Sequence, residues 1–151
     1  MNGDLEDIIM RIAFIGLGNM GAPMAANLIK EGFEVRGYDA MAGAREKAAT
    51  AMTVSETTLD AVAGAEAVVT MLPNGEIALQ VWSEIAVKLP VGTVAIDCST
   101  IDLASARAIH ELCSRAGLLP VDAPVSGGVG GAVAGTLTFM CGGADAAHDK
   151  A

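Results

Sequence analysis

The stretch Arg11-Ile12-Ala13-Phe14-Ile15-Gly16-Leu17-Gly18-Asn19-Met20-Gly21 decides how this chain of 151 residues is expected to fold. Its first five residues are a short, mostly apolar run that ends directly in glycines, which predicts a buried strand over residues 11–15. A helix is predicted to follow, with Pro23 in its first turn and its end at Gly32. The stretch therefore predicts the strand–turn–helix unit that opens a doubly wound α/β fold.

The three glycines of this turn have the spacing G-x-G-x-x-G, and each meets a physical need. Gly16 permits a tight turn, Gly18 lets the backbone approach a pyrophosphate, and Gly21 lets the helix pack close to the strand. The helix start then offers free N–H groups and a partial positive charge to phosphates. The spacing favours a dinucleotide site, and a glycine turn in an α/β domain without a ligand stays the alternative.

An acidic residue, Asp39, follows a second predicted strand over residues 33–38. At this position a carboxylate would accept hydrogen bonds from the ribose hydroxyls of adenosine, which favours NAD over NADP. The repulsion of a 2′-phosphate amounts to ~1 kcal/mol in water and up to ~4 kcal/mol near a protein surface. Arg36 and Arg45 are close in sequence and would soften this preference. The alternative is a solvated residue at a strand end.

The rest of the chain alternates short apolar runs with helical stretches, which is typical of a parallel sheet. Between residues 41 and 65, two short helices and a weak strand near 52–54 are expected. Ser99 and Asp102 are expected to share the capping of a helix. Strands are predicted over 67–72, 93–98 and 118–122, helices over 76–89 and 103–116, and a last strand over 136–141 that ends the ordered pattern. The fold class is therefore a Rossmann-type, doubly wound, mainly parallel sheet with helices on both faces.

Composition excludes several classes of protein. Nine Lys and Arg against 18 Asp and Glu give a net charge of −9, and only 3% of residues are aromatic. Such a chain lacks the positive field and the stacking rings of a nucleic-acid binder. No run approaches the ~20 apolar residues of a membrane helix. The three cysteines have no CxxC spacing, which argues against a disulfide framework or a thiolate metal site and favours a reduced, cytoplasmic protein.

Ligands of open parallel sheets bind at the carboxyl ends of the strands, so the loops after the later strands are the next candidates. These loops begin at Leu72-Pro73, at Asp97 and at Asp122. In the last of them Ser126 precedes Gly127 and Gly128, and a hydroxyl beside bare backbone amides can hold a carboxylate. A flexible turn between strands is the alternative interpretation of these residues.

Four blocks of sequence carry a resemblance to a known family. They are GLGNMGAPMAANL, MLP, IDCSTID and DAPVSGGVGGAVAGTLTFMCGG. In order and spacing they resemble the β-hydroxyacid dehydrogenase family from about Met10 to Gly143. The resemblance implies a Rossmann domain that binds NAD(P), followed by a helical domain that completes the active site and forms the oligomer. NAD, a small hydroxy acid and a homo-oligomer are thus the implied cofactor, substrate and assembly.

The resemblance also implies which residues bind the ligands. Those implied for the cofactor are Gly16, Leu17, Gly18, Asn19, Met20, Gly21, Asp39, Leu72, Pro73 and Thr100. Those implied for the substrate carboxylate are Ser126, Gly127 and Gly128. The run 136–140 resembles the 3-hydroxyisobutyrate branch of the family more than the tartronate semialdehyde reductase branch.

Members of this family carry a catalytic lysine on the helix that opens the second domain, and that lysine is expected beyond residue 151. The lysines at 30, 47, 88 and 150 and the histidines at 110 and 148 are not convincing replacements. Residues 1–10 are expected to be an acidic leader, 11–143 the NAD(P)-binding domain, and 144–151 the start of the connection. Two hypotheses remain: the cofactor half of a dehydrogenase, inactive by itself, or a non-catalytic nucleotide-binding module.

Overall fold

A computed structural model describes residues 9–151 of the chain. The leader expected over residues 1–10 lies almost entirely outside the described residues. No helix among residues 9–151 is both long enough and apolar enough to cross a membrane.

The centre of the molecule is a seven-stranded sheet in the order β3-β2-β1-β4-β5-β6-β9. All of these strands are parallel except β9, which pairs antiparallel with β6. The strands are β1 (Arg11–Ile15), β2 (Glu34–Tyr38), β3 (Thr53–Val54), β4 (Ala67–Thr70), β5 (Val94–Asp97), β6 (Leu119–Asp122) and β9 (Gly142–Gly143). The Rossmann-type doubly wound fold is confirmed.

Helices cover both faces of the sheet, and the strand order determines which face each helix takes. Right-handed crossovers place helices on one face while the strand order runs from β1 to β3, and on the other face while it runs from β4 to β6. Accordingly α1 (Gly21–Lys30) and α2 (Ala42–Ala48) share one apolar core. The opposite core holds α3 (Thr58–Val62), α4 (Gly75–Ile85) with the short 3-10 turn η1 (Ala86–Lys88), and α5 (Leu103–Arg115).

The alternation of side chains along β1 shows how one strand serves both cores. Ile12 and Phe14 pack on the α1 face, and Ala13 and Ile15 on the α4 face. Trp82 of α4 is fully buried in the second core. Because parallel strands covered on both faces must be apolar on both, the continuous apolar runs of the sequence predicted these strands well.

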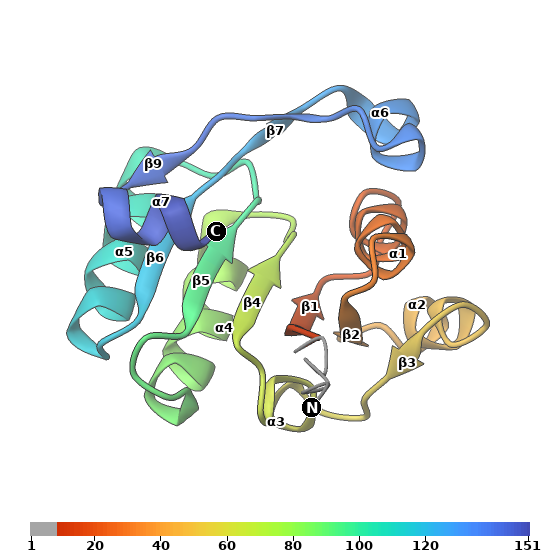
Figure 1. Ribbon diagram of the computed structural model, residues 1–151, viewed down its shortest axis with the longest axis horizontal. Helices are drawn as coiled ribbons and strands as arrows, with labels where there is room; N and C mark the ends of the chain where they lie inside the picture. The colour runs from red at the N-terminus through yellow and green to blue at the C-terminus, as the bar shows by residue number, and fades with distance from the viewer. Residues whose placement is uncertain (1–8) are drawn as a thin grey trace, which may run out of the picture.

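The chain after β6 differs from its prediction. Residues 136–141, predicted as one strand that ends the ordered pattern, contain only the two-residue strand β8 (Thr138–Phe139), which pairs antiparallel with β7 (Val125–Ser126) in a separate two-stranded sheet. Between them lies α6 (Gly128–Ala134), and α7 (Asp145–Lys150) follows β9 and packs on β6. This segment crosses above the carboxyl ends of the strands, from β6 to α1 (Figure 1). There the side-chain amide of Asn27 donates to the Ala132 carbonyl at 2.7 Å.

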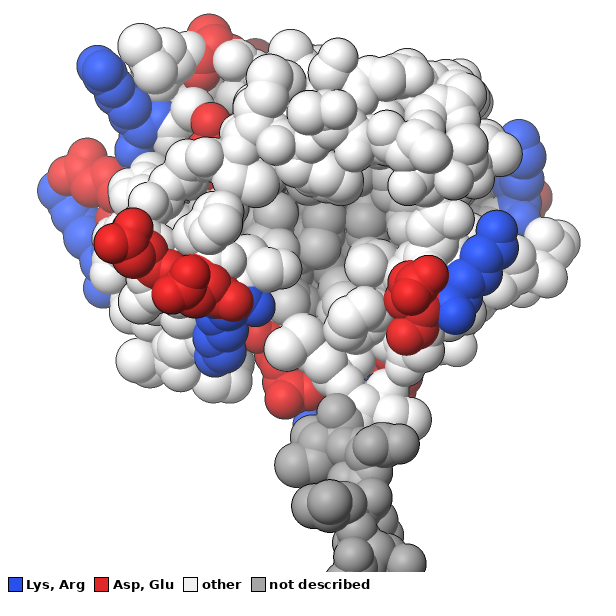
Figure 2. Space-filling view, turned by 45° about the horizontal axis from the view of Figure 1, so that its top comes forward, with Lys and Arg blue, Asp and Glu red and all other residues white. Residues whose placement is uncertain are grey.

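One half-face of the sheet has a large apolar cavity. On the α1 side, β4 and β5 lie between α1 and α7 with no helix in front of them (Figure 1). The cavity at this place has a volume of about 770 Å³, and Phe14, Val69, Ile96 and Val121 of four strands are among its lining residues. Figure 2 shows it as a hollow with an uncharged floor. It follows from the topology, because the crossovers of β4, β5 and β6 all run on the opposite face.

Candidate functional site

The glycine loop after β1 is built on two very close backbone contacts. A Cβ on Gly16 would lie 2.1 Å from the Met71 carbonyl oxygen, and Gly16 has a φ of +102°. A Cβ on Gly21 would lie 1.8 Å from the Gly16 carbonyl oxygen. The start of α1, the glycine loop and the loop after β4 are therefore stacked with no side chain between them, and any other residue would push them apart.

Gly18 has the opposite environment. No heavy atom lies within 4 Å of the position that its Cβ would take, and its φ lies outside the left-handed region. Packing thus does not require glycine at this position. The bare backbone leaves open space beside the N-terminus of α1, where free N–H groups favour an anion. The loop geometry fits the pyrophosphate of a dinucleotide.

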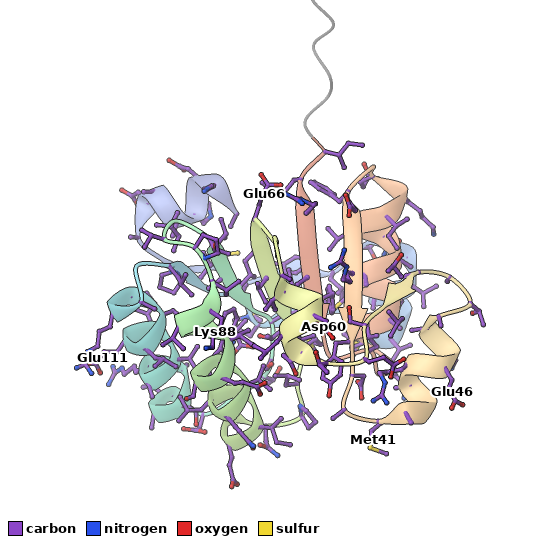
Figure 3. The ribbon with its side chains drawn as sticks, turned by 90° about the horizontal axis from the view of Figure 1, so that it is seen from below. Met41, Glu46, Asp60, Glu66, Lys88 and Glu111 are labelled. Atoms are coloured by element: carbon purple, nitrogen blue, oxygen red, sulfur yellow. The ribbon has the colours of Figure 1, made fainter. Side chains whose placement is uncertain are left out.

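The carboxylate of Asp39 is tied to the same loop. One oxygen accepts the Leu17 N–H at 2.8 Å, and the other accepts the Met41 N–H at 2.8 Å. The Met41 side chain points away from the fold (Figure 3). Since each carboxylate oxygen has two lone pairs, both oxygens can still accept from ribose hydroxyls. Arg45 donates to the backbone carbonyl of Asp39 at 2.8 Å, so its charge lies close by, as the sequence suggested.

The loops after β4 and β5 are joined by a side chain. The hydroxyl of Ser99 accepts the Leu72 N–H at 2.8 Å, and Ser99 itself is buried. The prediction that Ser99 shares the capping of α5 is therefore wrong, because its hydroxyl is turned inward to the neighbouring loop. Asp102 caps the helix, accepting the Ser105 N–H at 2.8 Å. Thr100 follows Ser99 on the exposed side of the loop.

A buried polar network underlies these two loops, and we call it the Asp97 network. Trp82 Nε1 donates to the Thr70 hydroxyl at 3.1 Å, and that hydroxyl donates to Asp97 Oδ1 at 2.8 Å. The Ser99 N–H donates to the same oxygen at 3.1 Å. The second oxygen, Oδ2, is buried and has no hydrogen-bond partner within residues 9–151. Burial therefore raises the pKa of Asp97 above its usual value, although the bonds from Ser99 and Thr70 oppose the shift.

This raised pKa predicts a pH dependence of stability. The native state disfavours the charged carboxylate, so the contribution of Asp97 to the free energy of unfolding falls as pH rises from 3.8, its unfolded value, to the higher native value. An Asp97→Asn variant lacks this loss. Its free energy of unfolding minus that of the wild type should therefore increase with pH across this window. Urea unfolding at several pH values measures it.

The control for that experiment has the opposite sign. The Ser105 hydroxyl and N–H hold the pKa of Asp102 below its usual value. Asp102 therefore stabilises the protein above its unfolded pKa and loses this effect as pH falls through the native value. For Asp102→Asn the same difference should decrease with rising pH. If the difference in free energy of unfolding between Asp97→Asn and the wild type does not change with pH, the raised pKa of Asp97 is contradicted.

The predicted carboxylate site after β6 lies at the same edge of the sheet. Ser126 ends β7, and Gly127 and Gly128 turn the chain into α6 with φ values of +133° and +64°. All three residues are exposed. Because α6 packs on α1, this segment is carried to the helix that begins at the glycine loop.

The lysines lie elsewhere. Lys30 ends α1, Lys47 is in the last turn of α2, and Lys88 follows α4 (Figure 3). Each precedes the amino end of the next strand, which is the edge opposite the glycine loop. Lys150 donates to the Gly92 carbonyl at 2.8 Å, and Gly92 lies just before β5, at that same far edge.

The structure also places the two histidines and Cys98, a potentially nucleophilic side chain at a strand end. His110 is exposed on α5, and His148 of α7 lines the apolar cavity. Cys98 is buried at the end of β5, and burial raises its pKa to about 12. A thiol that stays protonated at neutral pH is an inert, packed side chain.

Comparisons with known proteins agree with this geometry. The model of the NAD binding domain of 6-phosphogluconate dehydrogenase matches residues 11–151. The chain belongs to this family. It is an NAD-binding domain, and NAD is the cofactor that the family and its relatives imply.

Two curated relatives show which enzymes contain such a domain. A probable 3-hydroxyisobutyrate dehydrogenase of Mycobacterium tuberculosis is 49% identical over 133 residues, which are 87% of this chain and 45% of the relative. An NAD-dependent L-serine dehydrogenase of Pseudomonas aeruginosa is 43% identical over 145 residues, which are 93% of this chain and 49% of that protein. The chain thus spans about half the length of these relatives.

A solved structure gives the same picture. The Mycobacterium tuberculosis 3-hydroxyisobutyrate dehydrogenase, solved with L-serine, superposes with a TM-score of 0.92 at 44% identity. The match covers 95% of this chain and 50% of that chain. The NAD-binding domain described here is therefore an oxidoreductase domain by resemblance, with the fold of 3-hydroxyisobutyrate dehydrogenases.

Sequence reasoning missed the Asp97 network and the contact between Asn27 and Ala132. Asp97 was noted only as part of a loop, because its burial cannot be seen in the sequence. One signal was available: an aspartate at the end of an apolar strand, five residues before the helix cap Asp102. No sequence signal pointed to the contact of Asn27, since its partner Ala132 lies 105 residues away.

Proposed function

We propose that the NAD-binding domain is the cofactor half of a dehydrogenase that acts on a small β-hydroxy acid, with 3-hydroxyisobutyrate as the first candidate. The observation that carries this proposal is that four loops lie at the carboxyl edge of the sheet, in three groups. They are the glycine loop, the pair of loops joined through Ser99, and the Ser126–Gly128 segment. A dinucleotide on the first two would place its reactive end beside a segment suited to a carboxylate.

In this proposal each group of residues has one role. The backbone amides after β1 hold the pyrophosphate, Asp39 holds the adenosine ribose, and Leu72, Pro73 and Thr100 line the second half of the crevice. NAD, when bound, supplies the hydride acceptor. Ser126, Gly127 and Gly128 hold the carboxylate of the acid. Tartronate semialdehyde is the alternative substrate from the sequence, and L-serine joins it because of the Pseudomonas relative.

The proton on the substrate hydroxyl needs a separate acceptor. We propose that this group comes from outside residues 9–151, because the four lysines lie at the opposite edge of the sheet. The apolar cavity over β4 and β5 supports the same proposal, since such a surface is normally covered by further polypeptide.

A homo-oligomer and a cytoplasmic location are also proposed, the latter because all three cysteines are free.

The experiment is a binding and turnover measurement on the purified chain. We expect NAD to bind and 3-hydroxyisobutyrate to produce no more than a trace of NADH, because none of the lysines within residues 9–151 lies at the crevice. Rapid NADH formation would contradict this division of roles. Binding of NAD without turnover, even when the second half of a relative is added, would favour the alternative, a non-catalytic NAD-binding module.

Asp39 should set the choice between the two cofactors. Repulsion of the 2′-phosphate predicts that the wild type prefers NAD over NADP by roughly one to three powers of ten. Asp39→Asn removes the charge and keeps one acceptor oxygen, so this preference should collapse toward one while NAD affinity falls. Calorimetric titration with both cofactors measures the ratio. As the control, Glu46→Gln removes an exposed negative charge from α2 and should keep the preference for NAD over NADP.

A further inference from the structure

The Asp97 network connects two adjacent strand ends and no other part of the site. Thr70 ends β4 and Asp97 ends β5, and their side chains meet at 2.8 Å. From Asp97 the chain of bonds continues through the Ser99 N–H, and the Ser99 hydroxyl then accepts the Leu72 N–H. The relative positions of the loops after β4 and β5 are thereby fixed by side chains. The glycine loop and Asp39 have no bond to this network.

The network lies beneath the crevice and not in it. Thr70, Asp97 and Ser99 are each at most 4% exposed, and Trp82 is fully buried. None of the four can meet a ligand directly while it stays in this position. Any effect on binding must therefore pass through the loop residues above, which are Leu72, Pro73 and Thr100.

Keeping a carboxylate here opposes folding. Its Oδ2 is buried without a partner, and an unsatisfied polar group of this kind in a protein interior calls for an explanation. An apolar side chain would fill the space without that penalty. An apolar side chain, however, has no oxygen that could accept hydrogen bonds from the Thr70 hydroxyl and the Ser99 N–H together. We therefore attribute the aspartate at position 97 to its role as a hydrogen-bond acceptor.

The two ends of the dinucleotide meet different halves of the sheet. In the proposed function, Asp39 after β2 holds the adenosine ribose and the loop after β1 holds the pyrophosphate. The remaining half of NAD must then extend across the point where the strand order reverses, over β4 and β5. That is the region whose loops the Asp97 network fixes.

We propose that Asp97 is a positioning residue for the nicotinamide half of NAD, acting through Ser99 on the loops after β4 and β5. The proposal rests on the proposed function, because it uses that assignment of the loops. It separates the site into two parts: one held by the glycine loop and Asp39, and one held by a buried carboxylate.

The test compares ADP, which lacks the nicotinamide half, with NAD. Calorimetric titration gives both dissociation constants for each variant. Asp97→Ala should weaken NAD binding about tenfold or more and leave ADP binding within about twofold. The reason is that only the loops after β4 and β5, which face the nicotinamide half, are no longer held in place. Ser99→Ala should give the same pattern, since it removes the acceptor of the Leu72 N–H. Asp97→Asn, which keeps Oδ1 as an acceptor, should restore most of the affinity for NAD.

A matched control comes from the other end of β5. Thr93 is buried, and its hydroxyl donates to the Pro90 carbonyl at 2.8 Å, far from the crevice. Thr93→Val also removes one hydrogen bond made by a buried side chain, and it should change neither the NAD nor the ADP affinity. Circular dichroism confirms that each variant is folded. If Asp97→Ala does not fold, the affinities of Ser99→Ala for NAD and for ADP decide the question.

The outcomes separate the two proposals. A wild type that binds NAD no better than ADP would show that the loops after β4 and β5 hold no nicotinamide, which overturns the proposed site. A wild type that prefers NAD, with Ser99→Ala and Asp97→Ala keeping that preference, overturns only the role of Asp97. A parallel loss of NAD and ADP binding also overturns it, because a general structural defect would weaken both.

Discussion

Replacing Gly21 with alanine should strongly destabilise the NAD-binding domain. The new Cβ would lie 1.8 Å from the Gly16 carbonyl oxygen, and the Gly16 backbone is itself pressed against the Met71 carbonyl. None of these atoms belongs to a flexible side chain that can move aside. We expect a loss of about 3 kcal/mol or more in the free energy of unfolding. Thermal unfolding should show a decrease of roughly 6–12 °C in Tm.

The chain offers a matched control for this change. Gly43 lies in α2, and its Cβ position has no heavy atom within 4 Å. Alanine is the better helix former by roughly 1 kcal/mol, so Gly43→Ala should be neutral or stabilising. If Gly21→Ala unfolds at the same temperature as Gly43→Ala, the close contact between α1 and the glycine loop is not present in solution.

Replacing Gly18 with alanine should have the reverse effect: binding is lost and the fold is kept. The Cβ would enter open space without touching the protein, so the free energy of unfolding should stay within about 0.5 kcal/mol of the wild type. In the proposed site that space belongs to the pyrophosphate. Crowding it by one methyl group costs about 1–3 kcal/mol, which is roughly a tenfold to hundredfold loss of NAD affinity.

Titration calorimetry and thermal unfolding on the same samples test this prediction. Gly43→Ala is again the control and should bind NAD as the wild type does. An unchanged affinity in Gly18→Ala would mean that the phosphates lie elsewhere. Gly18→Ala and Gly21→Ala together separate the two functions of one motif, because one glycine leaves room for the ligand and the other leaves room for the protein.

The sequence predicted the sheet because its strands are apolar on both faces. Residues 11–15, 67–70, 94–97 and 119–122 are apolar runs bounded by turn residues, and such runs need no further information. The glycine loop and Asp39 were also placed correctly at one edge, since motif spacing and strand order fix them together. That they bind NAD at these atoms stays a prediction.

Beyond β6 the local signals were too weak. Residues 128–134 contain three glycines, which oppose a helix, yet α6 forms because it packs on α1 and its Ala132 carbonyl receives the Asn27 amide. Helices of this kind are stabilised by tertiary contacts that a single sequence does not reveal. The hydrogen bonds of Asp97 were hidden for the same reason, because its partners Thr70 and Ser99 lie in β4 and in the loop after β5.

The cavity over β4 and β5 has an architectural consequence. Reversal of the strand order creates the crevice at the carboxyl edge, and the same reversal sends α3, α4 and α5 to the far face. In a module of this type, the ligand crevice and the uncovered half-face therefore have the same origin, which is the reversal of the strand order. Different companion domains can be joined at that half-face without rebuilding the crevice, so the topology itself allows one nucleotide module to serve many chemistries.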